Sequence, residues 1–144
     1  MDDVCVSSLA PLAEPGLRMV LRQEWEGALG NNFIAATPGH PMLSDALEEA
    51  SEETLHGGNE SIWLRTGPGV LTRACARFMV RIGPQNLSRD HRVLLNGELS
   101  RYVAIHRPLS YKLDKRNWTI AEREGDHLSI RELYTARRNA AAAA

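Results

Sequence analysis

The feature that most constrains the fold is the segment from Pro41 to Leu55, which has helical periodicity between two helix-breaking sequences. Its apolar residues fall close to the spacing of one face of an α-helix. They are Leu43, Ala46, Leu47, Ala50 and Leu55. Pro41 suits a first helical turn, and the pair Gly57-Gly58 predicts the end of the helix. We therefore predict a helix that packs Leu47 and its apolar neighbours against a core and exposes its glutamates to water.

A second amphipathic segment follows the turn sequence Thr66-Gly67-Pro68-Gly69. Apolar side chains gather on one side of it: Val70, Leu71, Ala74, Cys75, Phe78 and Met79. Three arginines, spaced four residues apart, occupy the other side: Arg73, Arg77 and Arg81. The pattern predicts a second helix, with Leu71 in the core and the arginines on a solvated face.

Short apolar runs between these features are typical of strands. Residues 31–36 contain aromatic and β-branched side chains ahead of the break at Pro38-Gly39, and they predict a strand. Residues 17–25 fit either a buried strand or the start of a helix, and residues 61–65 could form a further short strand.

The dipeptide Asn96-Gly97 is the strongest hairpin signal in the chain. It lies between runs rich in Val, Leu, Tyr and Ile, and both of its residues tolerate the positive φ of a two-residue turn. We predict a hairpin that joins residues 92–95 to residues 98–106. The alternation of strands and helices before it predicts an α/β domain, or an α+β domain with a mixed sheet.

Composition is compatible with one compact domain and disfavours several classes of partner. The 144 residues are 43% hydrophobic and carry a net charge of −1, so no overall charge favours nucleic acid or an anionic membrane surface. No apolar run reaches the ~18 residues of a membrane span, and the N-terminal residues do not have the pattern of a signal peptide. Cys5 and Cys75 are too few for a disulfide framework, and we expect both to be buried free thiols.

The region around the first predicted helix resembles an enzyme family as one block. The block runs in this order: Asn31-Asn32-Phe33-Ile34-Ala35-Ala36, Thr37-Pro38-Gly39-His40-Pro41, the acidic helix, and Arg65-Thr66-Gly67-Pro68-Gly69. The order and spacing are similar to those of glycosyltransferase family 32, whose members carry a sugar-binding region with a DxD motif.

Two flanking segments add to this resemblance. Asp2-Asp3-Val4, followed by Pro11-Leu12, is similar to the tail of the family's Asp-x-Asp-Val segment, although Met1 stands where a first aspartate would match. His106, ahead of Leu109-Ser110-Tyr111, is similar to the family's C-terminal His and Gly-Ser-Trp, with Leu and Tyr in place of Gly and Trp. The resemblance covers about residues 2–112 and leaves residues 113–144 unassigned.

The resemblance implies both a fold and an activity. The fold would be a partial GT-A-like mixed sheet with flanking helices, without the N-terminal nucleotide-binding half. The activity would be metal-dependent transfer of a hexose from a nucleotide diphosphate sugar to a glycan or lipid hydroxyl, with retention of configuration. The resemblance assigns Asp3 and His106 as the residues that would hold Mn²⁺ or Mg²⁺. Such a divalent cation bridges the oxygens of the donor diphosphate. Donor-sugar contacts would come from Asn31, Asn32, Ser110 and Tyr111.

The residues themselves leave alternatives open. Asp3 could be a solvated acid, His106 a surface or strand-end group, and His40 a turn residue at a helix start. Trp25, between two glutamates, could stack on a sugar or belong to an ordinary strand end. The competing interpretation of the chain is a non-catalytic remnant that serves as a structural or interaction module, and the missing half predicts poor turnover by this chain alone. The location stays open, with the Golgi or another secretory membrane implied for a eukaryotic parent.

Overall fold

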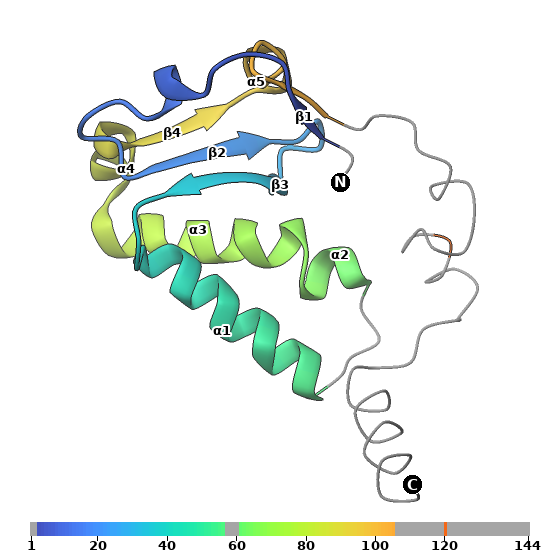
Figure 1. Cartoon of the computed structure of the whole chain (residues 1–144). Helices are drawn as coiled ribbons and strands as arrows, with labels where there is room; N and C mark the ends of the chain where they lie inside the picture. Colours follow the sequence, from blue (N-terminus) through green and yellow to red (C-terminus); the bar gives the residue numbers. More distant parts are fainter. Residues whose placement is uncertain (1–2, 57–60, 106–119, 121–144) are drawn as a thin grey trace, which may run out of the picture.

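The computed structural model describes residues 3–56, 61–105 and 120, which form a small mixed sheet with flanking helices (Figure 1). In chain order the elements are β1 (Val4–Cys5), η1 (Ala10–Leu12), β2 (Met19–Gln23), β3 (Leu29–Ala36), α1 (Pro41–His56), α2 (Ile62–Arg65), α3 (Pro68–Ile82), α4 (Pro84–Asp90), β4 (His91–Leu94), α5 (Asn96–Leu99) and β5 (Val103–Ala104). The predicted α/β class with a mixed sheet is confirmed. No helix in this described part of the chain is long and apolar enough to cross a membrane.

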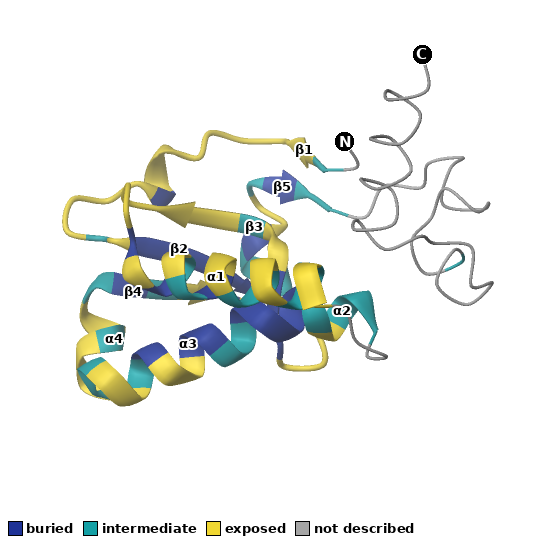
Figure 2. Ribbon diagram, turned by 90° about the horizontal axis from the view of Figure 1, so that it is seen from below, coloured by how far each residue is buried: buried dark blue, intermediate teal, exposed yellow. Residues whose placement is uncertain are grey.

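The centre of the main sheet is β2, with β3 on one side and β4 on the other. β2 runs antiparallel to β3 and parallel to β4. Met19, Val20 and Leu21 are each at most 2% exposed, and Figure 2 shows this strand as buried over most of its length. Such a continuous apolar run is typical of a strand that is covered on both faces. Residues 17–25 therefore contain a strand, the first of the two possibilities that the sequence left open.

Each face of β2 has its own hydrophobic core, because successive side chains of a strand point to opposite faces. Met19 and Leu21 pack with side chains of α1 and α3, among them Leu71 and Phe78. Val20 belongs to a second cluster, with Leu12, Leu94, Leu99 and Val103. In Figure 1, α1 and α3 accordingly lie below the sheet, and α5 lies above it.

The first predicted helix exists, but it faces the core differently from the prediction. Met42 and Ala46 are the buried residues of α1, whereas Leu47 is 69% exposed. Consecutive helix residues are about 100° apart, so burial of Ala46 turns Leu47 away from the sheet. The prediction that Leu47 lies in the core was wrong, and the prediction for Leu71, 4% exposed in α3, is confirmed.

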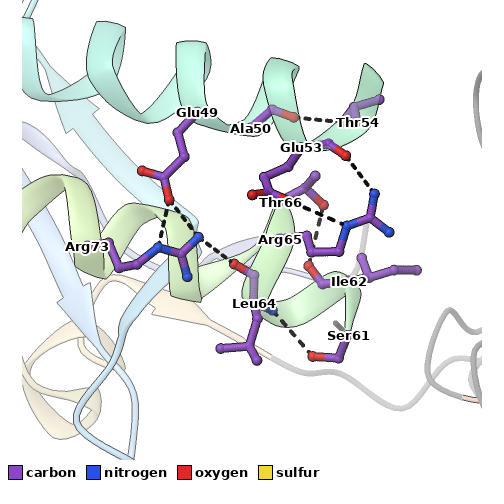
Figure 3. Close-up of polar contacts among 10 residues, drawn as sticks. All are labelled: Glu49, Ala50, Glu53, Thr54, Ser61, Ile62, Leu64, Arg65, Thr66 and Arg73. Carbon is purple, nitrogen blue, oxygen red and sulfur yellow. Dashed lines mark hydrogen bonds and ion pairs between the residues drawn. The ribbon is translucent and has the colours of Figure 1, made fainter. Parts of the chain in front are cut away.

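The arginines of α3 form ion pairs with α1 instead of facing only water. Arg73 Nε donates to Glu49 Oε1 at 2.6 Å, and its Nη2 donates to the carbonyl of Leu64 at 3.0 Å, so one side chain joins three helices (Figure 3). Arg77 bonds the other oxygen of Glu49, and Arg81 Nη2 lies 2.8 Å from Asp45 Oδ2. The expectation of two solvated faces was therefore wrong along this seam.

Three further local predictions are corrected. Residues 61–65 contain the short helix α2, whose first turn is capped by the Ser61 side chain, and not a strand. Asn96-Gly97 opens the helix α5 instead of closing a hairpin, because β4 pairs with β2 and not with the residues that follow it. Of the two cysteines, Cys75 is buried as expected, but Cys5 is exposed.

The two short outer strands connect distant parts of the sequence. β1 pairs antiparallel with β5, with Val4 opposite Ala104 and Cys5 opposite Val103. The backbone N–H of Val6 adds a hydrogen bond of 2.8 Å to the carbonyl of Tyr102. In Figures 1 and 2 this pair lies beyond the end of the main sheet to which β2 points.

Candidate functional site

A buried arginine organises the carboxyl end of the central strand. Arg22 is 1% exposed, and its guanidinium bonds side chains from three different parts of the chain. Its Nε donates to Asn96 Oδ1 at 2.7 Å, and its Nη1 donates to Asn32 Oδ1 at 2.7 Å and to Glu24 Oε1 at 3.3 Å. A buried cation is costly unless it is paired and hydrogen-bonded, so these partners make the position of Arg22 possible. We call Arg22, Glu24, Asn32 and Asn96 the guanidinium cluster.

An irregularity in β3 delivers Asn32 to this cluster. Along β2 the partner changes from Ile34, opposite Leu21, to Gly30, opposite Arg22. The three residues between those partners, among them Asn31 and Asn32, are extra residues on β3. Such bulges re-aim side chains that a regular ladder would point elsewhere. Both asparagines are exposed residues, and the side-chain oxygen of Asn32 reaches the buried guanidinium.

Gly30 leaves the space that the guanidinium cluster fills. A Cβ at this position would lie 2.9 Å from Asn32 Oδ1, 3.0 Å from Arg22 Nη1 and 3.0 Å from Glu24 Oε1. These distances are shorter than ordinary carbon contacts with nitrogen or oxygen. A side chain at Gly30 would therefore force the ends of these three side chains to shift.

A cavity of about 440 Å³ opens beside the guanidinium cluster. Its lining comes from the β2–β3 turn and from the start of α5: Gln23, Glu24, Trp25, Gly27, Leu95, Asn96, Gly97 and Glu98. Glu24 and Asn96 belong both to this lining and to the guanidinium cluster. The cavity lies at the carboxyl ends of the parallel strands β2 and β4, the edge at which open α/β sheets commonly bind ligands.

The sequence-predicted metal and donor residues fall partly inside the described chain. Asp3 is partly exposed and directly precedes β1. Ser110, Tyr111 and His106 lie outside the described residues, so their places relative to Asp3 and Asn32 stay predictions. Within the described ranges, no group of three or more His, Cys, Asp or Glu side chains is arranged to hold a metal ion.

A second polar cluster lies at the opposite, amino-terminal end of β4. His91 Nδ1 is 2.5 Å from Asp90 Oδ1, and His91 Nε2 is 2.9 Å from His40 Nε2. The simplest proton arrangement has His91 donating to the carboxylate and His40 donating to His91. His40 is 2% exposed and His91 is 8% exposed, and the rings of both contact the ring of Phe78. Burial lowers the pKa of His40, and the neighbouring His91 and Arg18 lower it further, against an opposing effect of Asp90.

His40 therefore does more than form a turn at a helix start. It joins the beginning of α1 to the beginning of β4, two segments that are far apart in the sequence. Sequence reasoning missed His91 and also missed Arg22 and Asn96. The charge of Arg22 inside the apolar run Met19–Gln23 was the available signal, because a charged residue in a buried strand requires partners.

Comparisons with protein-family models, curated proteins and solved structures found no match for this chain.

Proposed function

We propose that this chain contributes the donor-closing part of a metal-dependent glycosyltransferase of the GT-A type. The enzyme would transfer a hexose from a nucleotide diphosphate sugar to a glycan or lipid hydroxyl, with retention of configuration. The observation that carries the proposal is the pairing of β1 with β5. The resemblance to glycosyltransferase family 32 assigns Asp3, directly before β1, and His106, two residues after β5 in the sequence, to one metal site. The two strands are hydrogen-bonded neighbours.

The described part of the site has chemistry that suits this role. Asp3 supplies a carboxylate, the type of oxygen ligand that Mg²⁺ and Mn²⁺ prefer, and His106 would be its partner. When bound, the cation would stabilise the charge of the departing nucleoside diphosphate. The chain's own task would be to hold the donor sugar, which positions the anomeric carbon for transfer.

Asn32 is the described residue best placed for contact with the donor sugar. Its Oδ1 accepts a hydrogen bond from Arg22, which orients the amide and turns its N–H donors away from the guanidinium. An exposed amide with a fixed orientation suits a sugar hydroxyl, because little rotamer freedom is lost on binding. The exposed side chain of Asn31, in the same bulge, would add a second amide.

Calorimetric titration with UDP and GDP, in Mn²⁺ and in EDTA, tests the proposal on the full chain. We expect nucleotide binding that requires the metal and that weakens at least roughly tenfold, or 1.4 kcal/mol, in Asp3→Asn. Glu48→Gln is the matched control, because Glu48 is an exposed carboxylate on α1. It removes the same charge and should bind the nucleotide as the parent does.

The result that overturns the proposal is equally definite. Binding of neither nucleotide in Mn²⁺, or binding that is the same in EDTA, would refute a metal-dependent donor site. A non-catalytic structural or interaction module would then be the better interpretation. Equal losses in Asp3→Asn and Glu48→Gln would show that net charge, and not a ligand at Asp3, governs binding.

A further inference from the structure

The cavity beside the guanidinium cluster has an aromatic wall that the proposed donor site does not use. Trp25 is 87% exposed at the β2–β3 turn, and Leu95, which also lines the cavity, is 57% exposed. The turn is held by two backbone hydrogen bonds, from Glu24 N–H to the Ala28 carbonyl at 2.8 Å and from Gly27 N–H to the Glu24 carbonyl at 3.1 Å. Burial therefore does not explain the ring, and its backbone is fixed in place.

Hydrogen-bond donors and hydrogen-bond acceptors both line the cavity beside Trp25. Gln23 and Asn96 bring amides, and Glu24 and Glu98 bring carboxylates. Each carboxylate has a nearby arginine: Glu24 lies 3.3 Å from Arg22, and Glu98 lies 3.9 Å from Arg92. Among the described residues, both lining carboxylates are thus accompanied by an arginine, and the lining itself brings no cation that would attract a phosphate.

We infer that the cavity beside Trp25 is a binding site for a neutral hexopyranose ring of a glycan. One face of a pyranose carries C–H groups that stack on an aromatic ring, while its hydroxyls need both donors and acceptors. The volume of about 440 Å³ lies in the range of small-molecule sites and exceeds what one sugar ring needs. The bound pyranose would be the acceptor, next to the donor sugar at Asn32, and this role rests on the proposed function.

The test follows the indole N–H signal of Trp25 in ¹H–¹⁵N spectra of the full chain. The chain has three tryptophans, and loss of one signal in Trp25→Phe identifies that of Trp25. The titrants are the methyl α-pyranosides of glucose, mannose and galactose, without nucleotide or metal. We expect a saturable shift of the Trp25 signal by at least one of them, with a dissociation constant on the order of 1–10 mM, reasonable for a small ligand with few contacts.

Two variants and one anion make the test specific. Trp25→Ala removes the reporting indole, so its sugar binding is followed on the backbone N–H signals of Gly97 and Glu98, which line the same cavity. It should weaken binding at least roughly tenfold, a difference of about 1.4 kcal/mol. The matched control is Val80→Ala, which truncates an 86% exposed side chain on α3 and should leave sugar binding unchanged. Inorganic phosphate should shift the Trp25 signal less than the sugars do at equal concentration.

Each contrary result overturns the inference. No saturable shift at Trp25 with any of the three sugars would refute a sugar site, and unchanged binding in Trp25→Ala would place the sugar elsewhere. A larger response to phosphate would show that the cavity prefers anions. A sugar response at Trp25 combined with failure of the nucleotide titrations would keep the sugar site and reject only the proposed function.

Discussion

Replacement of Gly30 by alanine is the sharpest test of the guanidinium cluster. The new methyl group would lie 2.9–3.0 Å from atoms of Asn32, Arg22 and Glu24. All three atoms are ends of side chains and could move aside, but each movement stretches a hydrogen bond of the buried guanidinium. Loss of one hydrogen bond to a charged group costs about 1.5–3 kcal/mol.

The net effect follows from two opposing contributions. A Gly→Ala change in a strand is otherwise favourable by about 0.5–1 kcal/mol. We therefore expect Gly30→Ala to lower the free energy of unfolding by about 1–2 kcal/mol. For a chain of this size, that loss corresponds to a fall in Tm of roughly 3–8 °C. Urea denaturation and thermal melts followed by circular dichroism measure both quantities.

Two comparisons separate the proposed cause from general effects of the substitution. Gly97→Ala is the matched control, because a Cβ there meets nothing within 4 Å and the residue lies in α5, where alanine is favoured. It should leave stability unchanged or raise it by up to about 1 kcal/mol. In an Asn32→Ala background the nearest clashing atom is gone, so Gly30→Ala should cost less there. A Gly30→Ala protein as stable as the parent, or a penalty that is the same in both backgrounds, would refute the reasoning.

Three further predictions concern the helices and the histidine pair. Leu71→Asp should lower the free energy of unfolding by more than about 3 kcal/mol, whereas Leu47→Asp, at an exposed position, should stay within about 0.5 kcal/mol; equal losses in urea melts would contradict the observed facing of α1. Glu49→Ala should cost about 1–2 kcal/mol, because it leaves two arginines of α3 without their carboxylate, while Glu48→Ala should be neutral by the same measurement. The lowered folded-state pKa of His40 means that the unfolded chain binds more protons, so its contribution to stability is complete above pH ~6.5 and falls as the pH drops toward the folded-state pKa. Thermal melts between pH 7.5 and 5 should show this fall in the parent and a smaller fall in His40→Ala, and equal pH dependence in the two proteins would refute the assignment.

The longest elements could be predicted from the sequence, because their signals are local. The periodicity of residues 41–55, with a proline at its start and glycines beyond its end, needs no distant partner to favour a helix, and α1 spans Pro41–His56. The same holds for α3 and for the strand at residues 31–36, which α/β packing then places in one sheet. The identity of Leu71 as a core residue follows from the same periodicity.

The tertiary structure decided what each helix face contacts. Leu47 and Ala46 are adjacent in the sequence, and periodicity alone assigns both to one broad apolar stripe. Only the placement of α1 against α3 shows which of them is buried and that Glu49 and Asp45 meet arginines. Charge pairing between two helices depends on their relative position, which no local pattern contains.

The candidate site was decided even more by tertiary contacts. The sequence singled out Asn32, but its hydrogen bond to Arg22 depends on a bulge that appears only where β3 pairs with β2. The same is true of Asn96, which looked like a hairpin turn because Asn-Gly favours positive φ. Because β4 pairs with β2, no hairpin forms at Asn96. Its side-chain oxygen instead accepts a hydrogen bond from the buried guanidinium of Arg22. The local sequence favours particular backbone conformations. Among the folds compatible with them, the free-energy cost of an unpaired buried charge favours the one in which Arg22 is hydrogen-bonded.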